Sequence, residues 1–96
     1  MTLDDLQHSL TDDHPPAELS SEVRALWHDA RGEWDAAHRA VQDLDTADAA
    51  LVHAYLHRKE GDVGNARYWY GRARRPACTG ALDAEWEQIV TALLEA

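Results

Sequence analysis

The residues best suited to chemistry in this 96-residue chain are two histidines one helical turn apart. His53 and His57 lie in the segment HAYLHRKE, and their spacing of four residues puts both imidazoles on one face of a helix. Glu60 follows one turn later, and His28 or His38 could add a ligand from earlier in the chain. Imidazole and carboxylate groups bind zinc, so His53, His57 and Glu60 form a candidate metal site.

A packing interpretation competes with this one. Ala54 stands where the zinc protease motif HExxH has its glutamate, so the segment does not indicate that chemistry. Histidines at this spacing also occur between paired helices, where they hydrogen bond to polar neighbours. We therefore expect no resident cofactor, and we keep the metal site as an alternative.

A second cluster follows in the segment NARYWYGR. Four residues of this region fall at one helical face and predict a core-facing stripe: Val63, Ala66, Tyr70 and Ala73. The residues between them point elsewhere, and an arginine beside exposed aromatics is favoured at interfaces and in anion pockets. Alternatively, Trp69 packs under the acidic N-terminal segment or the C-terminal helix, and Arg72 bonds to that acidic segment. The candidate binding residues are His53, His57, Asn65, Tyr68, Trp69 and Arg72.

Motifs for catalysis are missing from the sequence. It contains no Ser-His-Asp ordering, nucleophile elbow, glycine-rich phosphate loop or CxxC pair. Arg74 and Arg75 precede Cys78 and could lower the pKa of its thiol, but a lone loop cysteine is more often incidental. A single cysteine also cannot form an internal disulfide, which fits a reducing compartment. We predict no catalytic residue.

Charge is distributed unevenly along a chain whose formal net charge is −9. Residues 1–22 carry six acids and no lysine or arginine, whereas residues 58–75 carry six basic residues and two acids. A strongly acidic protein is repelled by nucleic acids and by anionic membranes, so neither is an expected partner. The basic segment could bind an anion or an acidic partner, or neutralise the acidic ends of its own chain.

Apolar periodicity predicts an all-α protein. Stripes at helical spacing indicate helices over residues 2–10, about 16–30, 33–44, 47–60 and 63–73, with a last helix after Gly80. Thr46 is the expected N-cap of the fourth helix, and glycines at 32 and 61 are expected to end the helices before them. The N-terminus lacks the features of a signal peptide and no run spans a membrane, so we expect a cytoplasmic protein.

The segments around the two turns share one pattern. Gly32, Glu33 and Ala37 correspond to Gly61, Asp62 and Ala66 at a constant offset of 29 residues. Two similar helical hairpins in tandem are typical of a helical repeat.

The pattern A-x₆-G-[ED]-[WV]-x-x-A resembles the tetratricopeptide repeat over about residues 18–76. The residues that carry it are Ala25, Gly32, Glu33, Trp34 and Ala37, then Ala54, Gly61, Asp62, Val63 and Ala66. The spacing is shorter than the usual 34 residues of that family. Leu51 and Tyr55 replace the polar residues of a peptide-carboxylate clamp. The segment 53–76 also resembles a block in small uncharacterised bacterial proteins, which implies no activity.

These observations predict one all-α domain of antiparallel hairpins. It would comprise an acidic segment over residues 1–15, two tetratricopeptide-like hairpins over 16–76, and a capping helix within 77–96. We expect a small interaction module that binds a protein partner or itself, and the exposed ends of only two hairpins would favour a homodimer. The alternative is a small metal- or anion-binding protein, or an enzyme, using His53, His57 and the cluster Asn65, Tyr68, Trp69 and Arg72.

Overall fold

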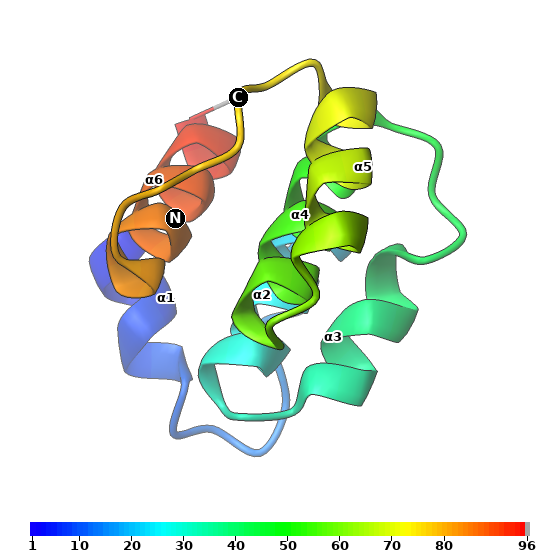
Figure 1. Cartoon of the computed structure of the whole chain (residues 1–96). Coiled ribbons are helices and arrows are strands. Elements are labelled where there is room, and N and C mark those ends of the chain that lie inside the picture. The colour runs from blue at the N-terminus through cyan, green and yellow to red at the C-terminus, as the bar shows by residue number, and fades with distance from the viewer. Residues whose placement is uncertain (96) are drawn as a thin grey trace.

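The computed structural model describes residues 1–95, which form helices joined by loops and contain no strand, and this confirms the all-α prediction (Figure 1). Ala96, the last residue of the predicted capping segment, lies outside the described residues. The helices are α1 Leu3–Ser9, α2 Ser21–Ala30, α3 Trp34–Val41, α4 Ala47–Lys59, α5 Val63–Ala73 and α6 Leu82–Glu95.

Helices α2 and α3 pack against each other, as do α4 and α5. Both turns need a glycine, because Gly32 has φ of 77° and Gly61 has φ of 89°. The hydrogen bonds also match. Glu33 N–H donates to the His28 carbonyl at 3.0 Å, and Asp62 N–H donates to the His57 carbonyl at 2.9 Å. The predicted correspondence of the two turns therefore holds locally.

The start of α2 differs from the prediction. We expected a helix from about residue 16, but α2 begins at Ser21 because the Ser20 side chain caps it by accepting from the Val23 N–H. Pro16 instead belongs to a turn in which its carbonyl accepts from the Leu19 N–H. Leu19 is buried although it precedes the helix.

The end of α3 also differs. The helix ends at Val41, and Leu44, expected on its apolar stripe, is 37% exposed. The sequence after Val41 is QDLD, and aspartates at a helix C-terminus are poor helix formers that meet the negative end of the helix dipole.

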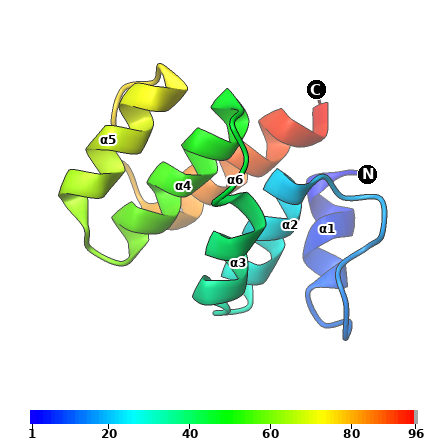
Figure 2. The same cartoon turned by 90° about the vertical axis from the view of Figure 1, so that its right-hand side faces the viewer.

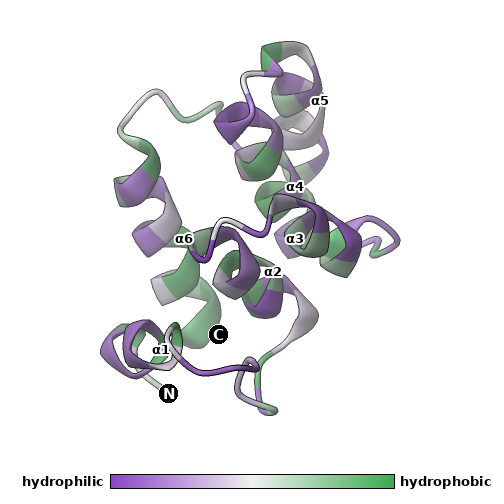
Figure 3. Cartoon of the chain, turned by 90° about the horizontal axis from the view of Figure 1, so that it is seen from below, coloured by the Kyte–Doolittle hydropathy of each residue, from purple (hydrophilic) through white to green (hydrophobic). Residues whose placement is uncertain are grey.

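Helix α6 covers more of the molecule than expected. It was predicted to be a capping helix at the end of the two hairpins, and it contacts α1 as well as α2 and α4. The indole N–H of Trp86 on α6 donates to the carbonyl of Leu26 on α2 at 2.9 Å. The C-terminal half of α6 is strongly hydrophobic (Figure 3), and Ile89 and Val90 are buried there. Apolar periodicity shows which face of a helix is buried but not against which neighbour.

Helix α4 lies in the middle of the fold. Figure 2 shows α5 at one end of the molecule and α1 at the other, with α4 between α5 and the remaining helices. Residues from Ala49 to His57 of α4 are all buried. Over residues 1–95, no helix is both long and apolar enough to cross a membrane.

Candidate functional site

Three histidines meet where α3 packs against α4. His38 comes from α3, and His53 and His57 come from successive turns of α4. His53 is 4% exposed and His57 is 8% exposed, whereas His38 is half-buried. One ring nitrogen of each lies within 4.8 Å of the others, so the structure joins His38 to the predicted pair. We call His38, His53 and His57 the histidine cluster.

The rings of the histidine cluster have a defined geometry. The Nε2 atoms of His38 and His53 are 2.8 Å apart, so one ring donates and the other accepts. The rings of His53 and His57 are nearly parallel, with centroids 5.1 Å apart. The His38 ring stands almost perpendicular to both of them, at 81° and 78°.

Glu60 supports the cluster from outside. Its Oε1 is 2.8 Å from Nδ1 of His57, so the carboxylate accepts the Nδ1 proton and leaves Nε2 as the free ring nitrogen. The structure places Glu60 beside His57, but the predicted set of His53, His57 and Glu60 does not form one group. Asp62 lies close enough to His57 and Glu60 for the three side chains to form a second group of possible metal ligands.

Two tryptophans flank the cluster. The indole of Trp34 stacks on His38 with centroids 4.9 Å apart, and the indole of Trp69 stacks on His53 with centroids 3.9 Å apart. The Trp34 N–H also donates to the carbonyl of Leu56 at 3.0 Å. We had expected Trp69 either to be exposed or to pack under a terminal segment. It is half-buried against α4 instead.

Burial lowers the pKa of two rings of the histidine cluster, those of His53 and His38. Burial, followed by the charges of His38 and His57, lowers the pKa of His53 to about 4. Burial and the charge of His57 also lower the pKa of His38. Both rings are therefore neutral near pH 7, and a neutral ring nitrogen can accept a hydrogen bond or bind a metal.

The outer surface of α5 carries the other predicted residues. Val63 was predicted to face the core but is 55% exposed, and it is the first residue of α5. Tyr68 is 54% exposed, as expected. Asn65 is exposed, but its amide donates to Asp62 at 2.7 Å and so completes the helix cap.

Arg72 is held by neighbours other than those considered from the sequence. Its guanidinium donates to the Tyr68 hydroxyl at 3.0 Å and to the Asp45 carboxylate at 3.1 Å. Asp45 belongs to the connection between α3 and α4, so the acidic N-terminal segment is not its partner. His28, a possible further metal ligand, pairs with Glu33 at 2.8 Å and lies outside the histidine cluster.

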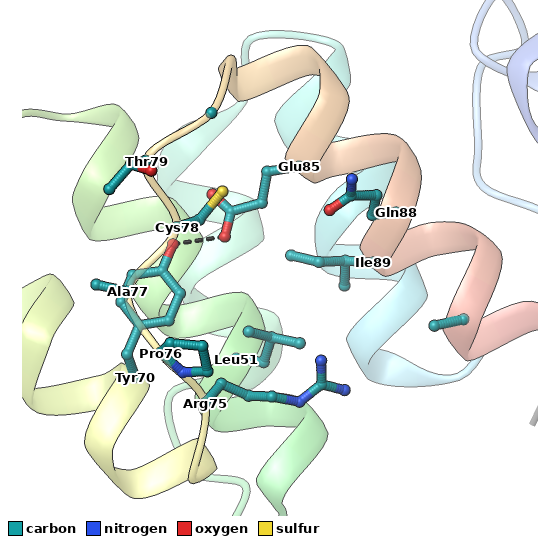
Figure 4. A pocket seen from close by; sticks show the side chains of 12 residues that line it. Leu51, Tyr70, Arg75, Pro76, Ala77, Cys78, Thr79, Glu85, Gln88 and Ile89 are labelled. Carbon is teal, nitrogen blue, oxygen red and sulfur yellow. Dashed lines mark hydrogen bonds between the residues drawn. The ribbon is translucent and has the colours of Figure 1, made fainter.

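A separate pocket of about 470 Å³ lies between the 75–80 loop and α6 (Figure 4). Glu85 is buried in its wall and is fully bonded: the Tyr70 hydroxyl donates at 2.5 Å and Arg58 donates at 2.7 Å. Arg58 also donates to the Gly80 carbonyl. This network ties the loop to α4, α5 and α6, so its groups are structural. Cys78, half-buried, lines the same pocket.

Sequence reasoning missed the Glu85 network and the stacking of both tryptophans on histidines. The contacts of Glu85 and the stack of Trp69 on His53 join residues at least 15 positions apart in different helices, so no local signal identifies them. Trp34 and His38 are four residues apart on one helix, and their spacing could have indicated the stack. Comparison of the chain with known protein families, with curated proteins and with solved structures gave no match.

Proposed function

We propose that the protein is a small interaction module that binds an acidic partner protein through the outer face of α5. The observation that carries this proposal is the exposure of Val63 and Tyr68. Each is more than half exposed, at 55% and 54%, and both lie on this one helix beside the exposed Arg67 and Arg72. We call Arg67, Tyr68 and Arg72 the α5 face, and Val63 lies exposed at the start of the same helix.

The composition of the α5 face suits a protein partner. Tyrosine and arginine are the residue types that most often dominate binding energy at interfaces, and an apolar side chain adds contact area. Helix α5 is also the outermost helix at its end of the molecule (Figure 2), so a partner reaches this face without displacing another element.

Charge favours an acidic partner over a second copy of the chain. Residues 58–75 carry an excess of basic residues in a protein with a net charge of −9. An acidic surface would be attracted to Arg67 and Arg72 locally, whereas two copies paired through α5 would bring like charges together.

Two glycines on the same helix support a close approach. Gly64 and Gly71 are exposed, and a Cβ atom built on either would meet no atom within 4 Å. Glycine in a helix interior costs about 0.5–1 kcal/mol relative to alanine. The packing of the chain itself does not require these glycines, but a partner helix lying against α5 would benefit from them.

The experiment places a photo-crosslinking amino acid at Tyr68 in native cells, with the same substitution at the exposed Gln88 of α6 as a matched control. We expect one specific adduct from position 68 and none from 88. The partner is then purified, and its affinity is compared for wild type, Tyr68→Ala and Arg67→Glu at low and high salt. Both variants should bind at least 10-fold more weakly, and salt should weaken wild-type binding. Equal adducts from both positions, or unchanged affinities, would overturn the proposal.

A further inference from the structure

We propose that the histidine cluster is a binding site for one divalent transition-metal ion of the zinc class. His38, His53 and His57 supply three nitrogen ligands, and water or an external ligand takes the fourth position. This site lies between α3 and α4 and does not depend on the partner proposed for the α5 face.

The separation of the nitrogens fits a metal ion. Tetrahedral zinc with bonds of 2.0–2.1 Å to nitrogen holds its ligand atoms about 3.3 Å apart. In the protein the closest pair, the Nε2 atoms of His38 and His53, are 2.8 Å apart, and all three candidate nitrogens lie within 4.8 Å. The required spacing falls inside this range, so small side-chain rotations bring all three nitrogens to one ion.

The contact of Glu60 with His57 matches the support that metal-binding histidines receive. A ligating histidine usually donates its other ring N–H to a carboxylate, which orients the ring and raises its basicity. Oε1 of Glu60 lies 2.8 Å from Nδ1 of His57, so Nε2 is the nitrogen that remains for the metal. The carboxylate also contributes a negative charge close to the cation.

Trp34 and Trp69 restrict the rings that would bind. Each indole lies nearly parallel to one imidazole, at 11° for Trp34 on His38 and 9° for Trp69 on His53. Rings held by packing lose little entropy on binding a metal, which favours affinity. His38 is only half-buried, so the site has an open side through which an ion can enter.

Hydrogen bonding within the protein explains the histidine cluster less completely than metal binding does. The bond between His38 and His53 satisfies one nitrogen of each, and Glu60 satisfies one nitrogen of His57. One metal ion would bond to all three imidazoles at once.

The test uses full-length protein without a histidine tag, stripped of metal by a chelator and then titrated. ZnCl₂ binding is followed by calorimetry, and CoCl₂ binding by the visible absorption of tetrahedral Co²⁺. We expect one ion per chain with a dissociation constant of about 1 μM or below. His38→Gln and His57→Gln should weaken binding at least about 100-fold, and Glu60→Gln should weaken it about 10–100-fold.

His28→Gln is the matched control. His28 also contacts a carboxylate through Nδ1 at 2.8 Å, but it is outside the histidine cluster, so zinc affinity should not change. His38 is the least buried of the three, so His38→Gln carries the test even if a variant of buried His53 does not fold. Circular dichroism of the metal-free variants verifies that each is folded. Zinc binding weaker than about 100 μM, or the same affinity in His38→Gln as in wild type, would overturn the proposal.

Discussion

The imidazole of His53 lies flat against the indole of Trp69, with ring centroids 3.9 Å apart and an interplanar angle of 9°. This stack joins the buried face of α4 to α5, so Trp69 belongs to the packing of the second hairpin. Tyr68, its neighbour in sequence, points outward and is 54% exposed. Of the two neighbouring aromatic residues predicted from the sequence to bind a partner, Trp69 is therefore structural and Tyr68 lies on the surface.

Replacing Trp69 should therefore destabilise the protein. Trp69→Ala removes the stack on His53 and part of the apolar contact between α4 and α5, and we expect a loss of about 2 kcal/mol. Tyr68→Ala on the same helix should change stability by less than about 0.5 kcal/mol. Urea denaturation followed by circular dichroism measures both. A similar loss in the two variants would contradict this division.

Stability of the metal-free protein should fall between pH 6.5 and pH 4. Burial lowers the pKa of His53 to about 4 in the folded state, whereas an unfolded histidine has a pKa of about 6.5. Between these values the unfolded chain binds more protons, so the contribution of His53 is complete above pH 6.5 and is lost as pH falls. The loss should be on the order of 2 kcal/mol by pH 5.

Urea midpoints at several pH values, with a chelator present, measure this dependence. His53→Gln should flatten the slope, because glutamine does not titrate. His8→Gln is the control, because the His8 side chain is 80% exposed, and its slope should match that of wild type. A His53→Gln slope equal to that of wild type would show that other groups cause the dependence.

Removing the buried carboxylate of Glu85 should be costly. Glu85→Ala leaves the guanidinium of Arg58 and the hydroxyl of Tyr70 without their partner, and we expect a loss of about 3 kcal/mol. Glu87→Ala removes an exposed carboxylate from the same helix and should have little effect. Thermal unfolding by calorimetry compares the two. If the two variants have the same melting temperature, the Glu85 network contributes little to the stability of the protein.

Glycine-to-alanine substitutions should have opposite effects at two kinds of position. Gly32→Ala and Gly61→Ala place a side chain at positive φ and should each cost about 1–2 kcal/mol. Gly64→Ala and Gly71→Ala lie within α5, with open space at the Cβ position, and should each stabilise by about 0.5–1 kcal/mol. Denaturant unfolding of the four variants checks these signs. Destabilisation by Gly71→Ala would show that α5 needs this glycine for its own packing.

The sequence by itself determined the helices and the turns between them. Apolar residues at helical spacing identified all six helices, and Gly32 and Gly61 marked the turns because only glycine enters positive φ at low cost. It also placed His53 and His57 on one face of α4, since a spacing of four residues is a local property. Boundaries were less accurate where capping by Ser20 and the aspartates after Val41 overrode periodicity.

Only the tertiary structure decided which of these faces meet. The approach of α3 to α4 brought His38 to His53 and excluded His28, although both were equal candidates from the sequence. The position of α5 turned Trp69 inward onto His53, and α6 buried Glu85 against Tyr70 and Arg58. Helical periodicity fixes the direction of a side chain around its own axis. The neighbour it meets depends on how helices pack, which is a property of the whole chain.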